Sequence, residues 1–281
     1  MTERLNTFRQ LHDGKQLLLL ANAWDAGSAR LIESLGAPAI ATSSAGVAWT
    51  QGYQDGAQMP PELAIAAARS IARVLSVPLT VDIENGYSSD PRAVADFVQR
   101  LVDSGVVGIN LEDGCEAPEL MARKIEAIKN ATARAGTDIF INARTDLYLH
   151  GAASETGRVE ATLARAAIFR AAGADGLFVP GILRADEIRA VAGGTGLPFN
   201  VMGYPGLPSA TELAGLGVRR LSAGAGIPRA LWGAARGMAQ GFLAHGDTGP
   251  LAAQGMSYDE LQQLFPRNPP SAAAPATPAT H

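Results

Sequence analysis

The stretch Pro78-Leu79-Thr80-Val81-Asp82-Ile83-Glu84-Asn85-Gly86-Tyr87 leads from a largely apolar run directly into acidic residues and a glycine. Apolar runs without polar alternation are typical of strands buried on both faces of a parallel sheet. In parallel α/β folds, the chemistry gathers at the carboxyl ends of the strands. The stretch therefore predicts a buried strand with Asp82 and Glu84 at its functional end. Because these residues are two positions apart, an extended chain would point them the same way.

Seven further runs of this kind recur along the chain, separated by helical patterns such as the one that begins at Pro61. They span residues 17–21, 38–41, 106–111, 138–141, 176–179, 198–202 and 218–221. Eight strands alternating with helices, most of them followed by polar residues, predict an α/β fold of the (β/α)8 TIM-barrel type. An open, doubly wound sheet is the alternative, although it would concentrate its site near one switch point.

The pattern changes toward the C-terminus. We expect residues 1–245 to form the barrel and residues 246–268 to form a helical extension, in which Ser257 caps a short helix. Residues 269–281 are rich in Pro and Ala, so a disordered tail is predicted there.

The composition excludes several classes of protein. The 281 residues are 47% hydrophobic, which allows a large core and excludes global disorder. A net charge of −4 without a basic run argues against nucleic acid as a partner. One cysteine excludes a disulfide framework and a cysteine-based zinc site, and no apolar stretch is long enough to span a membrane. The polar N-terminus does not resemble a secretory signal, so we expect a cytoplasmic protein.

Acidic residues follow two neighbouring predicted strands. Asp82 and Glu84 end the first strand, and Glu112 follows the next. Carboxylates that meet in this way repel one another unless a cation or protons intervene. An oxygen-only cluster suits Mg²⁺, with Mn²⁺ as an alternative, because such ions take few protein ligands and keep several waters. Each carboxylate alone is explained more simply as a helix cap or an ion-pair partner, but the three together favour a metal site.

Other strand ends carry candidate substrate-binding groups. The loop Thr42–Gly46 consists of small residues whose N–H groups could converge on a carboxylate or phosphate, unless it is an ordinary βα loop. Arg144 suits a carboxylate or an enolate oxygen, or else a structural ion pair. Asn200 is a further candidate. The loop Ser222–Gly226 is explained equally well as a phosphate cradle or as a tight turn.

Residue types that are missing from the strand ends also discriminate between functions. The three lysines, Lys15, Lys124 and Lys129, lie elsewhere, so a Schiff-base aldolase is not expected. Of the four histidines, only His150 lies near a candidate loop, which argues against a histidine-rich transition-metal site.

Together, Ser43-Ser44-Ala45-Gly46, Asp55, the stretch 82–87, Leu111-Glu112-Asp113 and Asn142-Ala143-Arg144 resemble the isocitrate lyase/phosphoenolpyruvate mutase superfamily. The resemblance runs in order from about residue 22 to residue 229. It implies a Mg²⁺-dependent modified barrel that acts on 2-oxo acids or on acids that yield an enolate. It also implies a homotetramer in which a C-terminal helix is exchanged between subunits.

The resemblance implies a role for each acidic residue. Asp82 resembles the direct Mg²⁺ ligand, and Glu84 and Glu112 resemble groups that hold the metal through water. Glu84 stands where an aspartate is more usual. Asp55, twelve positions after Ser43, resembles an acidic residue near the metal and is a candidate catalytic residue.

The expected substrate site follows in the same way. Ser43, Ser44 and Ala45 resemble the loop that binds the substrate carboxylate. Arg144 resembles the arginine that holds the carboxylate or the enolate oxygen, so it is both a binding and a catalytic candidate. Asn200 completes the expected set.

The chain departs from the family at its gate. Isocitrate and 2-methylisocitrate lyases carry a Cys-Gly-His motif after the acids that follow the predicted strand at 106–111, where this chain has Asp113-Gly114-Cys115-Glu116. Phosphoenolpyruvate mutases have a longer gate and a histidine after the strand that corresponds to 176–179, where Val179-Pro180-Gly181 stands here. We therefore expect a divergent member, a Mg²⁺-dependent lyase of a small 2-oxo or 2-hydroxy acid that works through an enolate. Alternatives are oxaloacetate decarboxylation, a carbon–phosphorus enzyme of phosphonopyruvate hydrolase or mutase type, and a non-catalytic barrel that binds a 2-oxo acid.

Overall fold

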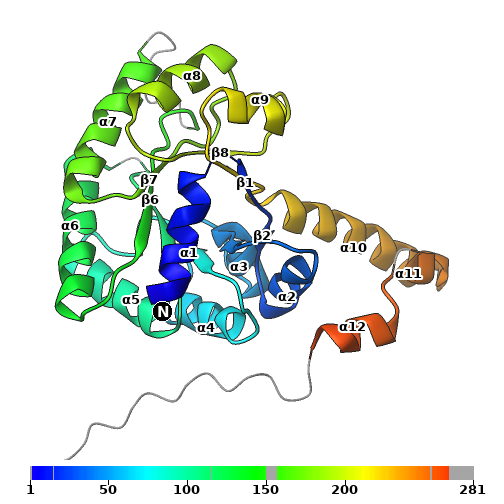
Figure 1. Ribbon diagram of the computed structural model, residues 1–281. Coiled ribbons are helices and arrows are strands. Elements are labelled where there is room, and N and C mark those ends of the chain that lie inside the picture. Colours follow the sequence, from blue (N-terminus) through cyan, green and yellow to red (C-terminus); the bar gives the residue numbers. More distant parts are fainter. Residues whose placement is uncertain (1, 15, 115, 150–156, 254, 266–281) are drawn as a thin grey trace, which may run out of the picture.

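The computed structural model describes residues 2–14, 16–114, 116–149, 157–253 and 255–265 (Figure 1). The strands are β1 (Leu18–Leu20), β2 (Asn22–Ala23), β3 (Ile40–Thr42), β4 (Leu79–Asp82), β5 (Gly108–Glu112), β6 (Phe140–Arg144), β7 (Gly176–Phe178), β8 (Phe199–Met202) and β9 (Arg220–Ser222). The helices are α1 (Thr2–Asp13), α2 (Ala26–Ser34), α3 (Ser44–Thr50), α4 (Pro61–Ala72), α5 (Pro91–Asp103), α6 (Pro118–Arg134), α7 (Arg158–Ala172), α8 (Ala185–Gly194), α9 (Ala210–Gly215), α10 (Gly226–His245), α11 (Gly249–Ala253) and α12 (Tyr258–Leu264).

The strands form one parallel sheet that closes on itself. Their order is β1-β9-β8-β7-β6-β5-β4-β3-β2. Because β1 and β2 are two parts of one extended segment, separated by Ala21, the sheet begins and ends in the same segment. β1 pairs with β9 through Leu18 and Arg220, and β2 pairs with β3 through Asn22 and Ala41. The helices surround this barrel, which confirms the predicted TIM-type fold (Figure 1).

All eight apolar runs of the sequence form strands in the expected order. The predicted strand ends are less accurate, because β5 and β6 extend into the polar residues that follow their apolar runs. Glu112 and Arg144 are consequently the last residues of strands and not loop residues. Alternation along a strand fixes the direction of each side chain, so both residues have defined positions in the barrel.

Helix α1 closes the amino end of the barrel, a role that the polar N-terminal sequence did not suggest. Phe8 is fully buried and meets Phe140 edge to face, with ring centroids 5.2 Å apart. His12, one turn later, stacks on the same Phe140 ring at 4.4 Å. Gly108 makes room for helix α1, because a Cβ at position 108 would lie 2.8 Å from the Phe8 ring. Helix α1 therefore closes the amino end of the barrel, and the candidate site lies at the carboxyl end.

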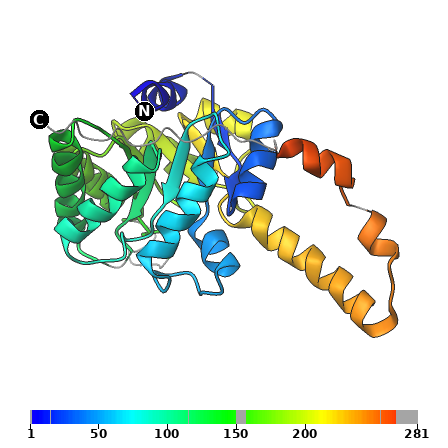
Figure 2. The same cartoon turned by 90° about the horizontal axis from the view of Figure 1, so that it is seen from below.

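The C-terminal helices form an arm beside the barrel. α10 projects from the barrel, and α11 and α12 return toward α2 (Figure 2). There Arg30 Nε donates a hydrogen bond of 2.9 Å to the Leu264 carbonyl. The expected helix after Ser257 is present as α12, and Ser257 forms a capping box with Glu260. Helix α11 was not expected. The predicted tail at 269–281 lies outside the described residues. Within the described part of the chain, none of the helices is long and apolar enough to cross a membrane.

The buried His12 makes the fold sensitive to acid. Burial, and after it the charge of Arg220, lowers the pKa of His12 to about 3, although a hydrogen bond from Nδ1 to the Phe8 carbonyl opposes the shift. The unfolded chain takes up a proton near pH 6.5 that the folded chain does not accept. The neutral ring therefore contributes stability that is complete above pH 6.5 and is lost as the pH falls toward 3.

The free energy of unfolding of the unaltered protein should fall as the pH is lowered from 6.5 to 4. We predict that His12→Phe, which keeps the aromatic packing, makes this fall smaller by up to about 3 kcal/mol. Urea titrations at several pH values measure this loss. His245→Phe, on the exposed end of α10, is the control and should leave the pH dependence unchanged. An equally steep decline in His12→Phe and in the unaltered protein would contradict the assignment.

Candidate active site

Three neighbouring strands end in charged residues at the carboxyl end of the barrel. β4 ends at Asp82, β5 at Glu112 and β6 at Arg144. Glu112 and Arg144 are partners in the β5–β6 register, and Glu112 Oε2 lies 2.6 Å from Arg144 Nη1. The sequence placed these three residues at strand ends, and the structure brings them together. The ion pair that was the simpler interpretation of Arg144 is present.

The surroundings of the Glu112–Arg144 ion pair make it unfavourable for Asp82 and Glu112 both to be ionised. Burial raises the pKa of Glu112 to about 8; Arg144 opposes that shift, and Asp82 adds to it. Burial also raises the pKa of Asp82, against the opposing effect of Arg144. Burial alone would lower the pKa of Arg144, but Glu112, Asp146 and Asp82 together raise it above its ordinary value. The site therefore holds more acidic groups than Arg144 balances, and an added cation would be stabilising.

A further carboxylate fixes the orientation of Arg144. Asp146 accepts two hydrogen bonds from the guanidinium, from Nε at 2.6 Å and from Nη2 at 3.0 Å, which restrains its plane. Behind it, the buried Asp113 accepts a bond of 3.2 Å from the Asp146 N–H and pairs with Arg165 of α7. Neither Asp113 nor Asp146 was chosen from the sequence. The available signal was their position one or two residues after Glu112 and Arg144.

A layer of buried amides supports the charged residues. Asn110 Nδ2 donates to Asp82 Oδ2 at 3.3 Å, and buried Arg220 donates to Asn110 Oδ1 at 3.2 Å. Asn142 Nδ2 donates one hydrogen bond to Asn110 Oδ1 at 2.9 Å and another to Asn200 Oδ1 at 3.0 Å. Asn200 also donates to the carbonyls of β8 and β9, so its amide is engaged within the barrel, and substrate binding by Asn200 stays a prediction. The signal for this layer was asparagine within otherwise apolar strands.

Glu84 does not continue β4, so the strand alternation from which we expected Asp82 and Glu84 to point the same way does not extend to Glu84. Its φ of 52° lies in the left-handed region, which a residue with a Cβ seldom adopts. It belongs to a turn in which the Gly86 N–H donates to the Ile83 carbonyl at 2.8 Å. The alternation argument holds only for extended chain, and the chain stops being extended after Asp82.

The Glu84 carboxylate is turned toward the loop that contains Asp55. Its Oε2 accepts hydrogen bonds from the N–H groups of Gly56, at 2.9 Å, and of Ala57. Asp55 is exposed, and its charge adds to the effect of burial in raising the pKa of Asp82. Asp55 therefore lies close enough for its charge to act on Asp82, on a loop that Glu84 holds. The catalytic role of Asp55 and the metal-holding role of Glu84 stay predictions.

Ser43, Ser44 and Ala45 lie where β3 passes into α3. Ser43 is the N-cap of this helix, and its Oγ accepts a bond from the Gly46 N–H at 3.3 Å. The hydroxyl of Thr42, one residue earlier, accepts the Asp82 N–H at 2.9 Å. The predicted carboxylate-binding loop is thus joined to the strand that carries Asp82, and its role stays a prediction.

The loop Ser222–Gly226 has the features of a tight turn. Gly224 has a φ of 57°, and a Cβ there would lie 2.4 Å from Met202 Sδ. Its N–H donates to Asn22 Oδ1 at 2.8 Å. Packing therefore accounts for the glycine without a phosphate.

The donor set suits a hard divalent cation that takes few protein ligands. Asp82 and Glu112 offer carboxylate oxygens, and their repulsion favours a positive charge between them. Among the described residues, no three His, Cys, Asp or Glu side chains are grouped as a ready metal-binding cage. Mg²⁺ does not need such a cage, because it keeps several waters and takes oxygens from its substrate. The residues present therefore fit Mg²⁺ or Mn²⁺.

We predict that Asp146→Asn lowers the free energy of unfolding by about 1.5–3 kcal/mol, because it weakens the two charge-assisted hydrogen bonds that hold the buried Arg144 guanidinium. Urea denaturation measures the change. Asp186→Asn is the matched control, since Asp186 accepts the same two bonds from Arg184 on an exposed surface, where such a pair contributes little. Equal decreases in the free energy of unfolding in the two variants would contradict a stabilising role for the buried Arg144–Asp146 pair.

Comparison with known proteins places this arrangement in a family. The sequence model described as Phosphoenolpyruvate phosphomutase matches residues 8–243. An uncharacterized protein of Mycobacterium tuberculosis is 38% identical over 222 residues, 78% of this chain and 81% of that protein. An oxaloacetate decarboxylase of Bradyrhizobium sp. is 30% identical over 229 residues, 78% of this chain and 76% of the relative. The crystal structure of a proposed phosphonomutase from Burkholderia cenocepacia J2315 is 40% identical, with a TM-score of 0.81, and covers 85% of this chain and 99% of that chain. The chain therefore belongs to the phosphoenolpyruvate mutase/isocitrate lyase superfamily of enzymes.

Proposed function

We propose that the protein is a Mg²⁺-dependent lyase that cleaves a carbon–carbon bond of a small 2-oxo or 2-hydroxy acid and leaves an enolate. The meeting of Asp82, Glu112 and Arg144 at the ends of adjacent strands carries this proposal. Family membership supports an enzyme of this general kind.

Each charged residue has a distinct part in the proposal. Asp82 and Glu112 would hold the cation, with Asp55 on the loop beside them. When bound, Mg²⁺ would supply Lewis-acid polarisation of the substrate oxygens. Asp146 holds Nε and Nη2 of Arg144, so Nη1 is the edge directed at the acidic cluster. Negative charge that develops near Nη1 is then stabilised by a donor that is already oriented.

The substrate carboxylate would bind at the turn from β3 into α3. Ser43, Ser44 and Ala45 stay the proposed contacts there. Thr42 supports this assignment, because its hydroxyl ties the turn to the Asp82 main chain. A carboxylate at this turn would lie close to the carboxylate that holds the cation.

Oxaloacetate decarboxylation is the second candidate, favoured by the name of the Bradyrhizobium relative. It passes through the same kind of enolate and needs no large second pocket. The matching family's name supports carbon–phosphorus chemistry as the third candidate. The products separate the candidates: decarboxylation releases CO₂ with the 2-oxo acid, a phosphonopyruvate hydrolase releases phosphate with it, a mutase only isomerises its substrate, and the lyase of the first proposal releases neither CO₂ nor phosphate.

We predict that the purified protein with Mg²⁺ releases CO₂ from oxaloacetate or a smaller 2-oxo acid from a 2-hydroxy diacid, and that EDTA abolishes the release. Arg144→Ala should lower kcat/KM by about 10²–10³-fold, as expected for the loss of one charge-stabilising donor. Arg184→Ala, at an exposed Arg-x-Asp pair, should leave kcat/KM unchanged. Undiminished turnover in Arg144→Ala, or phosphate release from phosphonopyruvate as the dominant reaction, would contradict the proposal.

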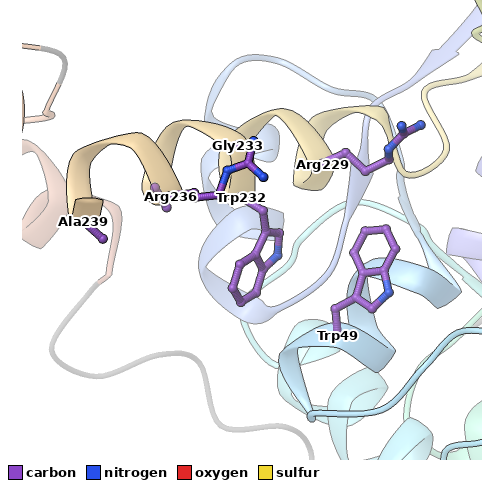
Figure 3. A pocket seen from close by; sticks show the side chains of 7 residues that line it. Trp49, Arg229, Trp232, Gly233, Arg236 and Ala239 are labelled. Carbon is purple, nitrogen blue, oxygen red and sulfur yellow. The ribbon is translucent and has the colours of Figure 1, made fainter. Parts of the chain in front are cut away.

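We also propose that the chain assembles into a homo-oligomer, a tetramer by resemblance, through α10 and the extension at 246–268. Across the 20 residues of α10, only Pro228 is buried. The large apolar side chains that it exposes are Ile227, Leu231, Trp232, Phe242 and Leu243. A helix with so little cover gains almost nothing from packing. Beside it lies a groove of about 840 Å³, flanked by Trp49 and Trp232, which a second copy would fill (Figure 3).

We predict that Trp232→Arg shifts the protein to a smaller assembly in light scattering coupled to gel filtration, because it replaces an apolar ring of the groove by a third positive charge beside Arg229 and Arg236. Leu183→Arg is the control, at a residue of similar character outside the arm. A monomeric native protein, or a variant with an unchanged mass, would contradict assembly through α10.

A further inference from the structure

Glu84 has contacts that a metal-holding role does not explain. Its N–H donates to Asp82 Oδ1 at 3.1 Å, and its carbonyl accepts the Glu112 N–H at 2.9 Å. The main chain of Glu84 therefore joins the two residues proposed to hold the cation. The strained φ of 52° is what lets one residue make both contacts, and strain of this kind collects at functional sites.

The side chain of Glu84 is bound to the loop at residues 51–58. Oε2 accepts the N–H groups of both Gly56 and Ala57. Ala57 has a φ of 58°, a conformation that a residue with a Cβ keeps only when its surroundings hold it. The carboxylate of Glu84 is the group in contact with the Ala57 N–H, so it supplies that restraint.

We propose that Glu84 is a positioning residue that latches the loop 51–58 and so presents Asp55 to Asp82 and Glu112. Asp55 directly precedes the latched Gly56, so the latch limits where its carboxylate lies. The part assigned to Asp55 rests on the proposed function, whereas the latch itself does not.

The length of the side chain is the specific requirement. An aspartate at position 84 would be shorter by one methylene, roughly 1.5 Å, and would withdraw its carboxylate from Gly56 and Ala57. The main chain at position 84 would still donate to the Asp82 carboxylate and accept the Glu112 N–H. The glutamate that departs from the residue more usual in the family thus has a structural reason in this chain: it reaches the loop.

Amide hydrogen exchange tests the latch on the full-length protein without metal or substrate. In Glu84→Asp and Glu84→Gly, we expect Gly56 and Ala57 to exchange at least about tenfold faster than in the unaltered protein, because both lose a charged acceptor. Glycine suits a φ of 52°, so Glu84→Gly removes the side chain without straining the turn. Exchange within twofold of the unaltered protein in both variants would overturn the proposal.

Glu33 offers a matched control elsewhere in the chain. Its Oε1 accepts the N–H groups of Ser76 and Val77 at 2.7 and 3.1 Å, which is the same kind of contact with two successive amides. Glu33→Asp should speed exchange at residues 76–77 and leave Gly56 and Ala57 unchanged. Faster exchange at Gly56 and Ala57 in this variant would show a general loosening and would overturn a local latch.

A double-mutant cycle tests whether Glu84 acts through Asp55. With a turned-over substrate, we expect Glu84→Asp to lower kcat by about 10–100-fold, as misplacement of a catalytic group does. In the Asp55→Asn background, the same change should have almost no further effect, since the latched group is already gone. Independent, multiplicative losses would overturn action through Asp55. The exchange result needs no turnover, so failure of the latch and failure of the proposed reaction are distinguishable.

Discussion

Repulsion among buried carboxylates governs the carboxyl end of this barrel. Asp82, Glu112 and Asp146 all act on the guanidinium of Arg144, and Glu112 still has a raised pKa. Arg144, at the end of β6, therefore does not neutralise Asp82 and Glu112 at the ends of β4 and β5 together with Asp146. Either protons or an added cation must complete the charge balance. The chemistry proposed for the site follows from that deficit, because a 2-oxo acid chelates a cation and adds oxygens of its own.

The rest of the structure keeps these charges in place. Below them, the amides of Asn110, Asn142 and Asn200 connect the strands through the interior of the barrel. Helix α1 seals the far end with Phe8 and His12, so the polar layer is supported by a packed floor. Such a scaffold fixes the site on rigid strands and leaves adaptation to the loops.

Much of the fold was predictable because buried parallel strands leave a strong mark in sequence. Apolar runs and the polar residues at their ends predicted the eight strands and the positions of Asp82, Glu112 and Arg144. What could not be predicted depends on contacts that are distant in sequence. The role of α1 requires the ring of Phe140, and the polar residues around Phe8 gave no sign of it.

The site shows the same limit. Alternation along a strand predicted a direction for Glu84, but it does not apply in the left-handed turn after Asp82; Asn85-Gly86 marks a turn in the sequence without giving the conformation of Glu84. The clamp of Asp146 on Arg144 is local in sequence, but its importance appears only when burial is known. The sequence identified Asp82, Glu112 and Arg144 but not Asp146, and the structure shows that Arg144 is already paired with Glu112 and Asp146.

Anomalous diffraction from crystals grown with Mn²⁺ and oxalate tests the central claim most directly, since oxalate is a stable chelating dicarboxylate. The account predicts a manganese peak within about 2.3 Å of an Asp82 carboxylate oxygen, with Glu112 beside it and oxalate oriented toward Arg144 Nη1. A peak elsewhere, or oxalate bound at Arg144 without manganese, would contradict it.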